Sequence, residues 1–300
     1  MSVQELWPLF RTHGFMTLTM VAGSFVAGVS SEGGGAVAYP VMTLVFEIDP
    51  AVARNFSFAI QSVGMTAAAL YIWARRIPVE TTYLWLVAAG SVPGLVGGTY
   101  LLAPLVPPAY AKMAFVSFFL SYGLALYVIN HVRDQDATDT LPALPLGQQA
   151  ELVGIGVIGG TLSAIFGNGI DICSFAFVTL KYRLSEKVAT PTSVTLMAFN
   201  AVLGFALHAL VLQDMQPEAY RFWWVSIPVV VFGAPVGAYV VSRVHRLYIA
   251  ALLYTVIGVQ FVSALWILQP GLPLLLFSAG VFAFGGLLFF QLPRWGPALS

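Results

Sequence analysis

Long apolar segments are the feature that most limits how this chain can fold. A helix needs ~20 mostly apolar residues to cross the hydrocarbon of a bilayer. Segments of that kind lie at 51–74, 79–104, 109–131, 186–212, 219–242, 246–268 and 272–291. Shorter apolar segments form two pairs, 14–31 with 33–46 and 148–166 with 169–182. Since each pair is interrupted by a polar break that contains glycine, we expect an all-α polytopic membrane protein with two broken helix pairs. Each pair either crosses the membrane as two short helices or re-enters as a hairpin.

The composition supports lipid as the solvent of this chain. Hydrophobic residues make up 59% of it and charged residues only 9%, whereas soluble domains carry roughly 25% charged residues. The 13 basic and 13 acidic residues leave no net charge, so nucleic acid is not an expected partner. The single cysteine, Cys173, excludes an intrachain disulfide and any multi-cysteine metal site. We expect no metal and no cofactor.

An internal repeat divides the chain into halves. A gap-free comparison at an offset of 136 residues gives 8 identities in 50 positions, among them Gly33 on Gly169 and Ser57 on Ser193. Each half holds one broken pair followed by three spans, so the halves enter the membrane from opposite faces, as inverted repeats of secondary transporters do. The expected parts are a first repeat, a polar linker, a second repeat and an extra C-terminal helix, at 1–131, 132–148, 149–268 and 269–300.

The loops differ in their content of lysine and arginine. One set of loops holds Arg75, Arg76, Arg133, Lys181, Arg183, Lys187, Arg243, Arg246 and Arg294, and the other holds Arg11, Arg54, Lys112 and Arg221. Cytoplasmic loops carry the excess of basic residues. We therefore expect a multi-pass protein of the cell (inner) membrane, with the N-terminus outside and the linker and C-terminus in the cytoplasm.

The two breaks are the candidate anion site. Each should start a short second helix whose first N–H groups lack an intrahelical partner and carry the positive end of the helix dipole. Glycine lets an anion approach such a backbone closely. The alternative is that these glycines only permit tight packing. The expected ligands of the anion are Ser30, Ser31, Gly33, Gly34 and Gly35 in the first break and Gly167, Asn168 and Gly169 in the second.

Two acidic residues, Glu32 and Asp171, lie at these breaks. An ionisable side chain at membrane depth is a functional hypothesis by default. A carboxylate beside an anion repels it unless it carries a proton, so both residues are candidates for proton coupling. The alternative is a carboxylate that caps the start of the short helix.

Polar residues also follow one face of the span after each break. We add four of them to the expected anion site because hydroxyl and amide groups suit an oxyanion: Ser57, Gln61, Ser193 and Asn200. Each could instead join neighbouring helices. His208 continues the stripe. Arg54, at the outer start of its span, is interpreted as an interfacial arginine, with attraction of anions as the alternative. Three glycine pairs are expected to be helix contacts, namely Gly94-x-x-x-Gly98, Gly156-x-x-x-Gly160 and Gly233-x-x-x-Gly237.

Sequence motifs in both halves resemble those of a known family. They are Gly28-Val-Ser-Ser-Glu-Gly-Gly-Gly35 with Pro40 and 53–57, and the segment 159–171 with 189–193. Both are similar to the signatures of the TauE/SafE sulfite exporter family. The resemblance implies transport of sulfite, sulfonates, sulfoacetate-like compounds or other small organic anions. The chain departs from the family at Ser30-Ser31-Glu32 and at Gly169-Ile170-Asp171, which bears on the substrate more than on the fold.

These observations favour a secondary transporter of a small anion, most of all a sulfur oxyanion or organosulfonate, working by alternating access with proton coupling. The alternatives are an anion channel built on the same hairpins and a transporter of a small carboxylate. An intramembrane enzyme is disfavoured because no nucleophile–base pair or metal cluster is visible, and a purely structural subunit would bind no ligand. The expected partners are the anion, the lipid bilayer, protons and further copies of the chain.

Overall fold

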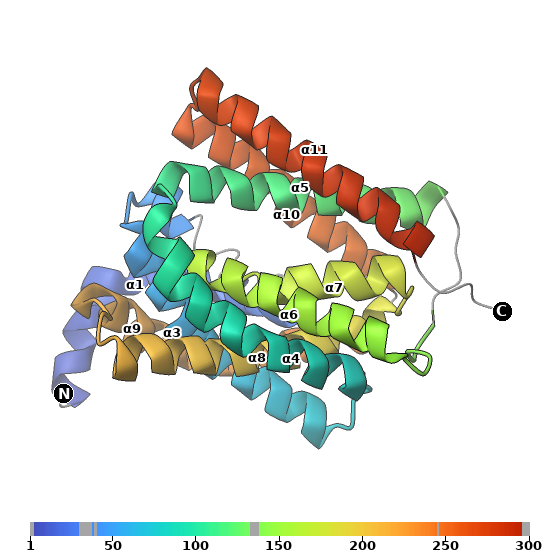
Figure 1. The fold of residues 1–300 in the computed structure, drawn as a ribbon. Coiled ribbons are helices and arrows are strands. Elements are labelled where there is room, and N and C mark those ends of the chain that lie inside the picture. Colours follow the sequence, from blue (N-terminus) through green and yellow to red (C-terminus); the bar gives the residue numbers. More distant parts are fainter. Residues whose placement is uncertain (1–2, 30–37, 39–40, 133–137, 245, 296–300) are drawn as a thin grey trace.

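The computed structural model describes residues 3–29, 38, 41–132, 138–244 and 246–295 (Figure 1). In these residues the chain is helical, and nine helices are long and apolar enough to cross a membrane, which confirms the expected fold class. The elements in chain order are α1 (Val3–Val29), η1 (Val41–Val45), α3 (Pro50–Ala74), α4 (Thr81–Gly97), η2 (Gly98–Leu102), η3 (Ala103–Leu105), α5 (Pro108–Val132), α6 (Leu146–Phe166), α7 (Ile170–Lys181), α8 (Glu186–Ala206), η4 (Leu207–Val211), α9 (Pro217–Val241), α10 (Arg246–Leu268) and α11 (Leu272–Trp295).

Local capping fixes where several helices begin. The carboxylate of Asp49 accepts from the N–H of Ala51 at 2.7 Å, ahead of α3. Glu80 does the same for Thr82 at the start of α4, and the Ser185 hydroxyl accepts from the N–H of a first-turn residue of α8. Short polar side chains at these positions satisfy N–H groups that have no intrahelical partner. The predicted spans therefore begin and end close to the observed helices.

The first helix of each pair is longer than the sequence pattern predicts. α1 has 27 residues and α6 has 21, and both qualify as candidate spans. α7 has only 12 residues, which is ~18 Å of helix and too short to cross. All of its residues are buried, so α7 is a half-length helix enclosed by the others.

The α6–α7 pair is a hairpin that returns to the end at which it starts. Lys181, the last residue of α7, forms an ion pair with Glu151 in the second turn of α6. The same end of the molecule holds residues 138–141, because Ser185 donates to the carbonyl of Thr138 at 2.7 Å. We call this the linker end. It also holds the start of α4, where Glu80 accepts from the N–H of Leu141.

The helices form a buried centre and a lipid-facing rim. α5, α10 and α11 lie together along one side of the bundle (Figure 1). Only 17% of the window from Leu272 to Gln291 in α11 is buried, compared with 61% of that in α3. Exposed apolar helices of this length suit contact with lipid. α3, α7 and α8 form the centre, where polar residues are shielded from the bilayer.

Glycines bring two pairs of helices into close contact. A Cβ at Gly94 would lie 2.1 Å from the carbonyl oxygen of Val157, so α4 packs directly on the backbone of α6. A Cβ at Gly237 would lie 2.5 Å from the carbonyl oxygen of Phe25, where α9 meets α1. The three small-residue pairs are thus helix contacts, as predicted. The first helix of each half, α1 or α6, thus packs against the second span after the break of the other half, α9 or α4. Such reciprocal packing is expected of two equivalent halves. That the two halves are inverted relative to each other stays a prediction.

Candidate functional site

Two glycines with left-handed backbone make the break between α6 and α7. Gly167 ends α6 with φ 81°, and its N–H donates to the Ser163 carbonyl at 2.7 Å. Gly169 precedes α7 with φ 144°. Residues with a Cβ rarely adopt either conformation. The break is completely enclosed, since Gly167, Asn168 and Gly169 are all buried.

Side-chain oxygen atoms of the protein accept hydrogen bonds from backbone N–H groups at the start of α7. The N–H of Gly169 donates to Oδ1 of Asp171 at 2.9 Å, and the N–H of Ile170 donates to the hydroxyl of Ser163 at 3.0 Å. In this conformation the Asp171 carboxylate therefore caps the start of α7. Capping was the alternative to proton coupling for this residue. Ser163 was missed by the sequence analysis, because nothing in its spacing sets it apart from the other small residues of α6.

Helix α3 packs against the break from the first half of the chain. The side-chain amide of Gln61 donates to the carbonyl oxygen of Gly167 at 3.3 Å. A Cβ at Gly167 would lie 2.7 Å from Cβ of Ser57 and 2.7 Å from the carbonyl oxygen of Arg54. Ser57 and Gln61 are buried. The structure thus places both residues beside the second break. They were predicted as part of an anion site formed by the two breaks together, and their part in binding stays a prediction.

Helix α8 packs against the start of α7. The hydroxyl of Ser193 donates to the carbonyl oxygen of Asp171 at 3.2 Å, and both side chains are completely buried. Asn200 lies two turns further along α8 and is 2% exposed. A further hydroxyl contact, from Tyr83 to Ser174 at 2.6 Å, joins α4 to α7. Tyr83 was also missed, because an aromatic residue in an apolar span gives no polar signal.

Several buried polar atoms around the break have no hydrogen-bond partner. In the described part of the chain they include Ser57 Oγ, Gln61 Oε1, Asp171 Oδ2 and Asn200 Oδ1. A buried polar group without a partner costs free energy, and more so at membrane depth, where water is absent. Unsatisfied groups of this kind are retained where a polar ligand completes them. These groups between α3, α7 and α8 are therefore the ones that a polar ligand at the break would satisfy.

The residues of the first break lie outside the described residues. They are Ser30, Ser31, Glu32, Gly33, Gly34 and Gly35. Their part in the site stays a prediction. In the described residues no three His, Cys, Asp or Glu side chains are grouped so that they could hold a metal ion.

A charged cluster lies next to the break, on the side away from the linker end. Asp214, in the turn between η4 and α9, contacts His208 Nδ1 through Oδ1 at 2.8 Å and Arg54 Nη2 through Oδ2 at 3.9 Å. Asn55 donates to the backbone carbonyl of Asp214 at 3.2 Å. The ring of Phe58 stacks on His208 with centroids 5.6 Å apart. The sequence analysis named Arg54 and His208 separately and did not foresee this contact through Asp214.

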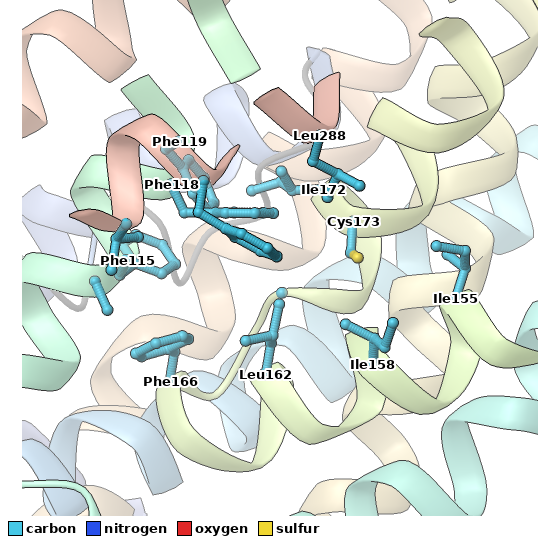
Figure 2. A pocket seen from close by; sticks show the side chains of 14 residues that line it. Phe115, Phe118, Phe119, Ile155, Ile158, Leu162, Phe166, Ile172, Cys173 and Leu288 are labelled. Atoms are coloured by element: carbon cyan, nitrogen blue, oxygen red, sulfur yellow. The ribbon is translucent and has the colours of Figure 1, made fainter. Parts of the chain in front are cut away.

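An apolar cavity of about 470 Å³ lies on the other face of α7. Figure 2 shows Cys173 and Ile172 of α7 among Phe115, Phe118 and Leu162 from neighbouring helices. Asp171 does not line this cavity. Its lining offers an anion no charged or hydroxyl side chain, although Gly169 of the break forms part of its wall.

Long apolar helices around a buried half-helix define a multi-pass membrane protein with a polar site in its interior. The chain matches the model of the family described as Sulfite exporter TauE/SafE over residues 15–265, and it belongs to this family of membrane transporters. The resemblance noted from the motifs is thereby confirmed. No curated protein and no solved structure matches the chain significantly.

Proposed function

We propose that the protein moves a small sulfur oxyanion or organosulfonate across the cell membrane, and that the anion binds at the break between α6 and α7. The observation that carries this proposal is the set of buried side chains at Ser57, Gln61 and Asp171. The unpartnered Ser57 hydroxyl and the Gln61 amide N–H groups can donate to an anion, whereas Asp171 Oδ2 can do so only when it is protonated. These side chains surround a glycine break at the positive end of α7. Such a helix start favours negative charge through its dipole and its N–H groups.

The donors present suit a compact oxyanion rather than a large ligand. Ser57 contributes a hydroxyl group without a partner, and Asn168 contributes a side-chain amide. The Ser193 hydroxyl can join them by leaving the carbonyl oxygen of Asp171, to which it donates in this conformation. A sulfite or sulfonate group has several oxygens that accept hydrogen bonds from different directions. Holding it with hydroxyls, amides and the helix dipole needs no buried lysine or arginine, which would be costly at this depth.

Asp171 gives the site a way to respond to protons. Its Oδ1 accepts the Gly169 N–H, while its Oδ2 has no hydrogen-bond partner. A negatively charged carboxylate here competes with an incoming anion for the helix start, whereas a protonated one does not. Asp171 and Glu32 are therefore the proposed proton carriers. Each would take up a proton when the anion binds.

Alternating access would expose this site first to one side and then to the other. The half-helix α7 and the spans α3 and α8 are the parts that meet at the site. Transporters of this kind rock one repeat against the other around a fixed binding site. An anion channel could use the same hairpin without such a cycle, so flux kinetics separate the two functions.

Purified protein in proteoliposomes tests the proposal. We expect saturable flux of sulfite or of a sulfonate such as sulfoacetate, stimulated by the same anion on the opposite side of the membrane. Acetate serves as the carboxylate comparison. Thermal unfolding of the detergent-solubilised protein with each anion measures binding independently of flux. Conductance at channel rates would replace the transporter with the channel, and a complete lack of both stabilisation and flux with all these anions would refute the proposal.

A further inference from the structure

Arg54 and His208 hold the carboxylate of Asp214 in the way that a binding site holds an anion. One carboxylate oxygen of Asp214 meets His208 Nδ1 at 2.8 Å, and the other faces the guanidinium group of Arg54 at 3.9 Å. The side chains of His208 and Arg54 are 0% and 14% exposed, whereas that of Asp214 is 43% exposed. The cationic partner and the imidazole are thus part of the protein interior, and the carboxylate reaches them from the surface.

Arg54 is held in place by neighbouring residues. Its Nε donates to the side-chain oxygen of Asn55 at 3.1 Å. Asn55 is completely buried and also donates to Oε1 of Gln216 at 3.0 Å. His208 is fixed by the stacked ring of Phe58. Donors that are positioned in advance bind an anion without a large ordering cost.

The cluster lies directly beside the proposed transport site. The backbone carbonyl of Arg54 is in contact with Gly167, as the 2.7 Å distance to a Cβ built there shows. Ser57, one turn further along α3, contacts the same glycine. The other side of the His208 ring carries a buried nitrogen, Nε2, without a hydrogen-bond partner. The start of α3, which carries Arg54 and Ser57, therefore joins the cluster to the break.

We propose that Arg54 and His208 form a second anion-binding site, on the predicted external side of the break, and that the protein's own Asp214 carboxylate occupies it in this conformation. This inference rests on the proposed function. The ligand class is the same as for the break, a small oxyanion such as sulfite, a sulfonate or a carboxylate. Binding of the external anion displaces Asp214 and opens the way to Gly167.

The chemistry explains why a side chain can stand in for the ligand. A carboxylate and a sulfur oxyanion both present adjacent oxygens with a shared negative charge, which imidazole N–H and guanidinium groups recognise. A tethered group competes at an effective concentration of roughly millimolar. Asp214 therefore excludes anions at low concentration and yields to them at high concentration.

Variants of Asp214 test the inference. Sulfite-induced stabilisation and flux into proteoliposomes are measured for wild type, Asp214→Ala and Asp214→Ala with Arg54→Gln. Removing the internal competitor should lower the half-saturating sulfite concentration about tenfold, and the added Arg54→Gln change should abolish this gain. Glu218→Ala is the matched control, since it removes an exposed negative charge from the first turn of α9. It should behave as wild type.

The outcomes separate this inference from the proposed function. An unchanged or higher half-saturating concentration in folded Asp214→Ala overturns the second site. Asp214→Asn keeps the size of the side chain and replaces the alanine variant if that variant does not fold. If neither variant folds, Asp214 is a structural residue and the proposal is also overturned. Ser57→Ala is measured in parallel. If it leaves binding and flux unchanged while Asp214→Ala tightens binding, the break is wrong as the transport site and the second site stands.

Discussion

The side-chain amide of Gln61 donates to the carbonyl oxygen of Gly167 at 3.3 Å, so a span of the first half of the chain holds the break of the second half. These residues are 106 positions apart in the sequence. The contact places the left-handed turn at Gly167 against the face of α3 that carries Ser57. A displacement of α3 relative to α8 must therefore alter the break, which is how movement of the halves would reach a bound anion.

Replacing Gly167 with alanine should disrupt the site. The backbone conformation at φ 81° is strained for any residue with a Cβ, by ~1–2 kcal/mol. The new methyl group would also press on Ser57 and on the backbone of Arg54. We expect a lower unfolding temperature and loss of anion flux. Gly154→Ala in the same helix is the control, because nothing lies within 4 Å of a Cβ there. Normal flux in Gly167→Ala would show that the break does not need this turn.

The buried hydroxyl groups should contribute directly to anion affinity. A hydrogen bond to a charged group contributes ~1.5–3 kcal/mol, so Ser57→Ala is expected to weaken sulfite binding by about tenfold or more. Ser62→Ala is the matched control on α3, since its hydroxyl bonds the carbonyl of Ala59 in its own helix. Titration of thermal unfolding with sulfite measures both variants. Equal affinities for Ser57→Ala and Ser62→Ala would place the anion elsewhere.

Proton coupling should be lost when Asp171 can no longer ionise. Asparagine has nearly the same size as aspartate, and its side-chain oxygen can keep the bond from the Gly169 N–H. Asp171→Asn should therefore fold, bind anion, and lose acceleration of flux by a pH gradient. Asp139→Asn, on an exposed residue of the linker, is the control. The coupling proposal fails if Asp171→Asn and Glu32→Gln both keep the pH dependence of wild type.

The spans and the second break could be predicted from the sequence because lipid leaves few choices. A run of apolar residues such as 51–74 can only be a helix at membrane depth, and helix α3 covers nearly the same range. The glycines at 167 and 169 stood out because polar, flexible residues interrupt an apolar run. Ser57 and Ser193 were found through the repeat, which aligned two serines that the structure places on α3 and α8 beside the break.

The contacts through Asp214 could not be predicted in the same way. Arg54 and His208 are 154 positions apart in the sequence, on different helices, and no period or spacing connects them. The turn that carries Asp214 is placed by packing of α9 against α1 and α3 and by hydrogen bonds from Asn55 and to His208. Ser163 escaped notice for a similar reason, since its hydroxyl meets the Ile170 N–H only after the chain reverses at the break.

Tight glycine packing between α4 and α6 should be needed for stability. A methyl group at Gly94 would meet the carbonyl oxygen of Val157 at 2.1 Å, and the two backbones would have to separate. Overpacking of this kind costs ~1–3 kcal/mol. We expect Gly94→Ala to lower the unfolding temperature of the purified protein. Gly97→Ala, on the same helix with nothing within 4 Å, should be neutral or slightly stabilising. Equal effects of the two substitutions would argue against close α4–α6 contact.

The loops that share an end of the molecule should lie on the same side of the membrane, and labelling tests which side that is. Residues 138–141 and Glu80 lie at the linker end, whereas Asp214 and Glu218 lie in and after the turn that precedes α9. Single cysteines at Asp139 and Glu218, in a Cys173→Ala background, should react with a membrane-impermeant maleimide from opposite sides. The basic loops predict that Glu218→Cys is labelled in intact cells and that Asp139→Cys is labelled only after the membrane is opened. Labelling of both cysteines from outside would contradict their placement at opposite ends of the molecule. Labelling of Asp139→Cys alone in intact cells would invert the proposed orientation but leave the hairpin unchanged.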